Sequence, residues 1–404
     1  MFDKNLGGVR EGDRDAVNYE VGPEYRRFNQ KNNVIMRSAW DPALDDYSER
    51  SKQAITGHIE KGDRGFGHLD FAFDTGAMAV VSSFGTGINR PNSGFTSWEP
   101  LSTSNEREVP EELKVDGAGS PAELQSKVRR VARYLGADLV GFTPLDERWV
   151  YSNHFLPGKG EDGKGENPPV EFPQGCDQVI VMGLGMDHDM MATAPTAIMM
   201  TETHRNYSNM AALSGSVAQF IRAMGYTAIP SLNDTALNVP LAIDAGLAQP
   251  SRLGPAITPE FGPRVRLCKV ITDMPLGAVK NQRDFGVIEF CEVCEKCADS
   301  CPVGSLPSGP RTTEGTNISS NPGVLKWYAN YESCRRYWAH VGTNCGICIR
   351  VCPFNHGKGF HHAIAKWLIT FRWKWINRLL VRMHGWLGYG EQKDPAFFWN
   401  GSGG

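Results

Sequence analysis

Two short stretches decide how this chain is interpreted: CEVCEKCADSCP at residues 291–302 and CGICIRVCP at residues 345–353. The chain has ten cysteines, and eight of them lie between Cys291 and Cys352. A disulfide scaffold would spread its cysteines over a shorter chain. The clustering therefore indicates metal ligation.

The spacing of the first stretch is C-x2-C-x2-C-x3-C-P, the run found in bacterial ferredoxins, and it predicts two [4Fe–4S] clusters. Three close cysteines face one cluster, and the fourth, before the proline, reaches the other. A zinc site is the alternative, but it favours two separated pairs. The second stretch has Gly342 at the first position of the run, and we expect Cys334 to replace it. One cluster then takes Cys291, Cys294, Cys297 and Cys352, and the other takes Cys301, Cys334, Cys345 and Cys348.

Composition sets broad limits. The 404 residues carry a formal net charge of −3, which gives no general argument for nucleic acid. No run of 18 apolar residues is present, so no membrane span is expected. Residues 1–14 lack an apolar core and a twin-arginine pair, which leaves two alternatives: a cytoplasmic protein, or one whose leader has been removed.

Strand and helix patterns alternate in the middle of the chain, which indicates an α/β or α+β class. We expect helices near 120–135, 193–224 and 235–246, and strands near 138–142, 178–183, 226–230 and 264–270. Residues 63–103, rich in Gly, Phe and Ser, predict irregular loop. The expected units are a wrapping segment (1–110), a core (111–288, with a loop insertion near 150–175), a cluster domain (289–357) and a tail (358–404).

The tail is basic and aromatic. Residues 359–390 contain five Lys or Arg, no Asp or Glu, and interleaved tryptophans. One interpretation is an amphipathic helix on a membrane surface or on a partner. The simpler interpretation, which the pattern alone favours, is a helix that packs its aromatic residues on the body of the protein.

Almost 290 residues precede the first cluster cysteine, which argues for an enzyme or cofactor-binding unit that receives the electrons. Within them the chain resembles the reductive dehalogenases, the corrinoid iron–sulfur catalytic subunits of organohalide respiration. The matching stretches are Tyr207-Ser208-Asn209-Met210, Asn233-Asp234-Thr235-Ala236, residues 257–266 and residues 272–276, together with both cysteine runs.

The resemblance implies an α+β fold: a nitroreductase-like, cobamide-binding core of α/β/α layers with an inserted ferredoxin-type domain. It implies a base-off cobamide that receives electrons from the two clusters and reductively cleaves the carbon–halogen bond of a small organohalide, with release of halide. It also implies a small membrane-anchor subunit, a respiratory electron donor and a periplasmic location on the cytoplasmic membrane if a leader was removed. A homodimer is compatible with it, and nucleic acid is not expected.

By motif match Tyr207 is the proton donor, Arg266 the cation beside it and Asn233 the residue that orients it. A phenol is a weak acid unless a cation stabilises its anion, which gives Arg266 an independent rationale. Thr203, one helical turn before Tyr207, and Trp338, close to Cys334, are the candidate pocket residues. Ordinary structural roles are the alternatives: packing for the tyrosine, an ion pair for the arginine and a helix cap for Asn233.

Two other functions stay open. Epoxyqueuosine reductase shares the cobalamin and the two clusters, but it needs a basic RNA face and this chain is net acidic. A non-catalytic electron-transfer subunit would carry the two clusters and no corrinoid.

Overall fold

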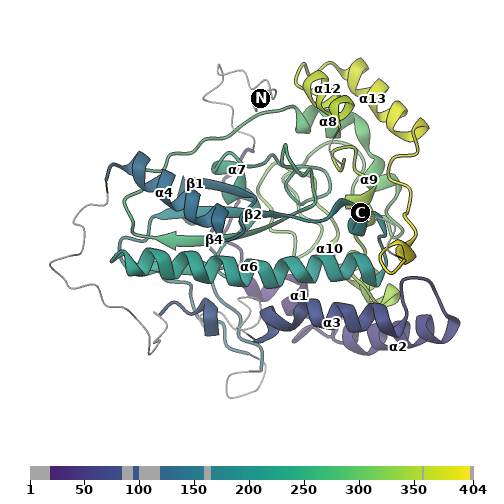
Figure 1. The fold of residues 1–404 in the computed structure, drawn as a ribbon, viewed down its shortest axis with the longest axis horizontal. Coiled ribbons are helices and arrows are strands. Elements are labelled where there is room, and N and C mark those ends of the chain that lie inside the picture. Colours follow the sequence, from purple (N-terminus) through teal and green to yellow (C-terminus); the bar gives the residue numbers. More distant parts are fainter. Residues whose placement is uncertain (1–18, 84–93, 100–118, 159–164, 357–358, 401–404) are drawn as a thin grey trace.

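The computed structural model describes residues 19–83, 94–99, 119–158, 165–356 and 359–400 (Figure 1). Its centre is a four-stranded sheet in the order β1-β2-β4-β3, and all three neighbouring pairs are antiparallel. The strands are β1 (Leu139–Pro144), β2 (Gln178–Gly185), β3 (Ala228–Ser231) and β4 (Val265–Thr272). All four strands were predicted from the sequence to within a few residues.

The strands alternate their side chains between two cores. Even-numbered residues such as Ile180 and Val270 pack in one core, while odd-numbered residues such as Val179 and Ile271 pack in the other. By this alternation Arg266 lies on the first face and Lys269 on the second. Arg266 and Lys269, which both belong to the candidate site described below, therefore lie on opposite faces of the sheet.

Helices cover the first face. They are α4 (Pro121–Tyr134) and α6 (Ala197–Ala223), and α6 runs along the length of the sheet in Figure 1. Helix α4 begins with the capping box that Ser120 and Glu123 form. The predicted helix near 193–224 is in fact preceded by a separate short helix, α5 (His188–Ala192), because Pro195 interrupts the backbone hydrogen bonds between the two.

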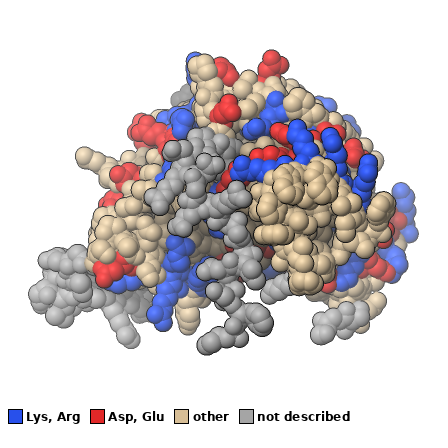
Figure 2. All heavy atoms as spheres, turned by 90° about the horizontal axis from the view of Figure 1, so that it is seen from above, with Lys and Arg blue, Asp and Glu red and all other residues tan. Residues whose placement is uncertain are grey.

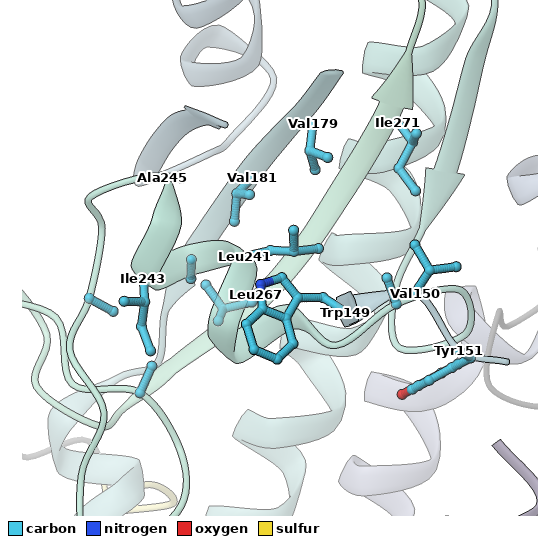
Figure 3. Packing of buried hydrophobic residues seen from close by; sticks show 14 of the residues in the cluster. Trp149, Val150, Tyr151, Val179, Val181, Leu241, Ile243, Ala245, Leu267 and Ile271 are labelled. Atoms are coloured by element: carbon cyan, nitrogen blue, oxygen red, sulfur yellow. The ribbon is translucent and has the colours of Figure 1, made fainter. Parts of the chain in front are cut away.

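The second face is covered by α7 (Asn238–Asp244) and by irregular segments. Trp149 is at the centre of this core, next to Leu241, Val181 and Leu267 (Figure 3). Its indole nitrogen donates a hydrogen bond of 3.1 Å to the buried Asp244. The layers are thus helix, sheet, and a mixed layer of one short helix and loops.

The N-terminal part corrects the sequence analysis. Residues 63–103 were expected to be loop, but α3 (His68–Ser83) occupies part of them and packs along α6. It follows α1 (Val34–Arg37) and α2 (Tyr47–Lys61). In the described part that precedes these helices, Val21 pairs with Val324, so this segment contacts residues close to the cysteine-rich helices.

The cysteine-rich part consists of short helices joined by turns. They are α8 (Val287–Cys294), α9 (Lys296–Asp299), α10 (Tyr331–Val341) and α11 (Ile347–Arg350). The chain ends with α12 (Phe360–Ile369) and α13 (Lys374–Trp386), which lie at the edge of the molecule in Figure 1. Helix α13 packs on α8, the helix that carries the first two cluster cysteines.

Candidate active site and iron–sulfur centres

The structure brings together the three residues that were expected to act on the substrate. Tyr207 comes from α6, Asn233 from the loop after β3 and Arg266 from β4. The Asn233 amide nitrogen donates to the Tyr207 hydroxyl oxygen at 3.1 Å. The Arg266 guanidinium carbon is 5.6 Å from the centroid of the Tyr207 ring. Tyr207 thus has an amide donor at its hydroxyl and a guanidinium beside its ring.

Two further residues fix the direction of the Asn233 amide. The Asn238 amide nitrogen donates to the Asn233 side-chain oxygen at 2.7 Å, so the Asn233 nitrogen faces the tyrosine. Asn238 is fixed in turn because its own oxygen accepts from the Lys269 ammonium at 2.8 Å. A hydrogen-bonded chain therefore runs from Lys269 through Asn238 and Asn233 to Tyr207. It crosses from one face of the sheet to the other at the end of β3.

Lys269 is fully buried in the central strand β4. Burial lowers the pKa of Lys269 to about 8, and burial raises the pKa of the neighbouring Asp234. Asp234 accepts hydrogen bonds from the Ser231 hydroxyl and the Leu232 amide, both at 2.9 Å. The Lys269 ammonium donates to the Leu232 carbonyl oxygen at 3.1 Å, and its positive charge interacts with that of Asp234. These contacts hold the loop that carries Asn233.

The sequence analysis did not identify Asn238 or Lys269. For Lys269 a signal was present, because a single lysine inside the apolar run Leu267-Cys268-Lys269-Val270 requires a buried partner. Asn238 has no comparable signal, because its role depends on a loop conformation.

The two candidate pocket residues lie in different places. Thr203 is buried, and its hydroxyl is 3.4 Å from an Arg266 guanidinium nitrogen. It therefore lies beside Arg266, in the group that also contains Tyr207 and Asn233. Trp338 lies on α10 instead, where its side chain donates to the Cys334 thiol. No contact of Trp338 with the catalytic group is found among the described residues.

A cavity of about 420 Å³ opens beside Asn233. Its walls come from the N-terminal segment, the loop with Trp149 and Tyr151, the start of α7 and residues 319–331. Phe28 and Tyr331 lie on its wall as well. The thiols of Cys334 and Cys348 are close enough to Tyr331 to interact with it electrostatically. The cavity therefore borders Asn233 and reaches Tyr331 of the cysteine-rich region, while Tyr207 and Arg266 are not among its lining residues.

The eight cysteines gather in two sets. Electrostatic interactions join Cys352 to Cys291, Cys294 and Cys297, and join Cys334 to Cys301 and Cys345. Cys348 interacts with the second set and with one thiol of the first. These are the two groups expected from the spacing, with Cys334 in the place of the missing cysteine.

The surroundings of these thiols suit a metal cluster. Burial raises the pKa of Cys294 and Cys334 to about 12 and that of Cys297 and Cys345 to about 11. Iron would instead bind such groups as thiolates, and it compensates the charge that burial disfavours. In the part of the chain that the structure describes, no three His, Cys, Asp or Glu side chains are arranged around a single metal ion.

Fold and cysteines together define the class: a mixed α/β protein with a double iron–sulfur cluster domain. The model of the 4Fe-4S double cluster binding domain matches residues 290–355. The tetrachloroethene reductive dehalogenase of Sulfurospirillum multivorans is 39% identical over 77% of this chain and 66% of its own length. That of Dehalobacter restrictus is 32% identical over 75% of this chain and 60% of its own. The chain belongs to the reductive dehalogenase family.

Solved structures agree with this assignment at the level of the fold. The catabolic reductive dehalogenase NpRdhA in complex with 3-bromo-4-hydroxybenzoic acid superposes with a TM-score of 0.70 at 21% identity, over 96% of this chain and 50% of that chain. A reductive dehalogenase structure described as suggesting a mechanism for B12-dependent dehalogenation has a TM-score of 0.69. The chain spans about two thirds or less of the length of these relatives.

Two further findings concern the similarity to epoxyqueuosine reductase and the presence of membrane-spanning helices. The epoxyqueuosine reductase of Bacillus subtilis is 32% identical, but only over 26% of this chain. Among the described residues, no helix is both long and apolar enough to cross a bilayer.

Proposed function

We propose that the chain is a reductive dehalogenase that replaces the halogen of a small organohalide by hydrogen. The reaction consumes two electrons and one proton and releases a halide ion. The observation that carries the proposal is the catalytic group itself: Tyr207, held by Asn233 and flanked by Arg266, next to a cavity that extends toward the cysteine-rich domain. Family membership supports it, since relatives are named for tetrachloroethene.

Tyr207 is the proposed proton donor. Its hydroxyl oxygen accepts from the Asn233 amide, so the hydroxyl hydrogen can point toward a substrate. When the proton leaves, the phenolate is stabilised by that amide and by the Arg266 guanidinium. Arg266 has an unpartnered Nε that is buried, so it retains a donor for substrate, halide or cofactor. An unsatisfied buried donor in a native site is a sign of a ligand.

The residues around the cavity fit a cobamide in the nitroreductase-like core that we propose. The lining is mostly apolar, with the amides of Asn233 and Asn238 and the hydroxyl of Tyr151 among its polar groups. No histidine is found among its described lining residues. The cofactor supplies the reducing cobalt; the protein residues bind it, orient the substrate and deliver the proton.

We assign one cluster to Cys291, Cys294, Cys297 and Cys352, and the other to Cys301, Cys334, Cys345 and Cys348. The second cluster is the one nearer to the cavity, because Tyr331 lies between its thiols and the cavity. Electrons would thus enter at the first cluster and leave from the second. The periplasmic location, the membrane-anchor subunit and the respiratory donor stay predictions from the family resemblance.

The test is Tyr207→Phe in protein loaded with cobamide and both clusters. Because general acid catalysis contributes about 10²–10⁴-fold, dehalogenation should fall by that factor while iron and cobalt contents stay unchanged. Tyr134→Phe, at an exposed tyrosine of α4, is the matched control. Full activity of Tyr207→Phe would reject the tyrosine as acid. An electron-transfer subunit, in contrast, would bind iron and no cobamide.

A further inference from the structure

The C-terminal helices expose an unusual number of large apolar side chains. Trp386 and Phe360 are each 79% exposed, and Trp375 is 64% exposed. The simpler interpretation of the tail, in which the aromatic residues pack on the body, is therefore wrong for most of them. We define the C-terminal patch by its exposed apolar members: Phe360, Ile364, Trp367, Trp373, Trp375, Leu379, Met383, Trp386 and Leu387.

The patch is continuous and ordered. Trp367 contacts Phe371 edge to face at a centroid distance of 4.7 Å, and Phe371 stacks on Trp373 at 5.3 Å. Trp373 in turn stacks on Trp375 at 6.2 Å. This row of rings joins the end of α12 to the start of α13. A contiguous exposed apolar surface of this kind marks a binding surface rather than scattered surface residues.

Basic residues line one side of the patch. Lys374, Arg378 and Arg382 follow one another at intervals of four residues and form one exposed row on α13. Trp375, Leu379, Met383 and Trp386 form the adjacent row. No ion pair of the three basic residues is found in the described part of the chain. In Figure 2 the face seen from above carries a broad tan area with Lys and Arg side chains along part of its border.

The opposite side of α13 anchors the helix. Ile376, Asn377 and His384 are buried, and Leu380 and Val381 pack on the core that contains Cys291 and Cys297. The exposed apolar row lies between this buried side and the basic row. Helices that lie in the plane of a membrane show this order, with aromatic residues at the level of the headgroups and cations toward anionic lipids.

We propose that the C-terminal patch binds directly to a lipid surface that carries anionic headgroups. Charge favours lipid over a second copy of this chain. A symmetric dimer through this face would bring the basic row of one copy close to that of the other, which is unfavourable. The basic row belongs to residues 359–390, which contain no Asp or Glu, although the formal net charge of the whole chain is −3. Bound in this way, α13 would hold α8 and the first cluster close to the membrane.

The test uses the cluster-loaded protein and flotation with vesicles of phosphatidylcholine alone or mixed with phosphatidylglycerol. We expect binding to the anionic vesicles that weakens as salt rises. The triple change Lys374→Glu, Arg378→Glu and Arg382→Glu should weaken binding about 100-fold, at about 1 kcal/mol per charge. Trp386→Ser, at a side chain with no core contacts to lose, should weaken it on either vesicle.

The matched controls are on α4, where Arg130, Arg133 and Tyr134 are also exposed. Arg130→Glu with Arg133→Glu, and separately Tyr134→Ser, should leave binding unchanged. Lipids brominated high on the acyl chain should quench tryptophan fluorescence more than lipids brominated near its end. Three outcomes would overturn the proposal: no flotation of the wild type, equal loss in the α4 controls, or a concentration-dependent dimer that the patch variants dissociate without any lipid binding.

Discussion

The orientation of the Asn233 amide leads to a prediction about its neighbour Asn238. Replacing one atom of this side chain, in Asn238→Asp, should lower kcat more than truncating it in Asn238→Ala. Asn238 donates to the Asn233 oxygen at 2.7 Å and so forces the Asn233 nitrogen to face Tyr207. In Asn238→Asp this donor becomes an acceptor. The Asn233 amide should then turn over, donate to the new carboxylate, and present its oxygen to the Tyr207 hydroxyl. The hydroxyl hydrogen would be bound by that oxygen instead of being free for the substrate.

The magnitude follows from the hydrogen bond that is lost. A hydrogen bond to a charged group is worth about 1.5–3 kcal/mol, and the bond from Asn233 to the developing phenolate is of this kind. Since about 1.4 kcal/mol is tenfold in rate, Asn238→Asp should lower kcat roughly 10- to 150-fold. In Asn238→Ala the Asn233 amide can still adopt either orientation. The decrease in kcat should then be close to the effect of one neutral hydrogen bond, about fivefold.

The assay is anaerobic steady-state dehalogenation with reduced viologen as electron donor, together with iron and cobalt analysis. Asn281→Asp, at an exposed asparagine, is the control for the chemical change. Both variants lose the hydrogen bonds from the Asn238 nitrogen to the Leu232 and Leu267 carbonyl oxygens, so denaturant unfolding of each variant is measured beside its activity. Equal kcat in the two variants, or a smaller effect of aspartate than of alanine, would refute the reasoning.

Two further predictions concern other groups. Lys269→Met should lower the free energy of unfolding by about 1–3 kcal/mol at neutral pH, because it removes the hydrogen bonds of the ammonium to Leu232 and Asn238 and the positive charge that interacts with the buried Asp234. Burial raises the pKa of Asp234, so in the fold this carboxyl becomes charged only above its ordinary range. The deficit of the variant, followed by denaturant unfolding, should therefore grow as pH rises through the folded-state pKa of Asp234, and a deficit that does not change with pH would contradict the interaction. Cys334→Ala should leave about four of eight iron atoms in a stable cluster, as measured by iron analysis and electron paramagnetic resonance. Cys176→Ala is the control. Full iron content in the Cys334 variant would show that Cys334 is not a ligand.

The sequence predicted those parts of the molecule that local chemistry determines. The cysteine spacing, the cap at Ser120 and the four apolar strands each carry their signal within a few residues, and the structure has the helix and the strands near the expected positions. The gathering of the thiols in two sets agrees with the spacing as well. Of residues 63–103, which were interpreted as loop, residues 84–93 and 100–103 lie outside the described part of the chain.

The N-terminal helices could not be predicted in the same way. Helix α2 buries none of its residues, so it has no apolar face for the sequence to reveal. Helix α3 contains Gly76 and several small residues, and its conformation depends on packing along α6. The tail shows the opposite case, since its aromatic residues suggested a core contact that the fold does not provide. Whether such a row is buried depends on tertiary packing, which no local pattern contains.

The most direct measurement is chloride release from tetrachloroethene by the chain loaded with cobamide and both clusters, under anaerobic conditions with reduced viologen. The account predicts one chloride for every two electrons consumed, only when both cobamide and clusters are present. Clusters that are reduced and reoxidised without any halide release, in the presence of bound cobamide, would contradict it.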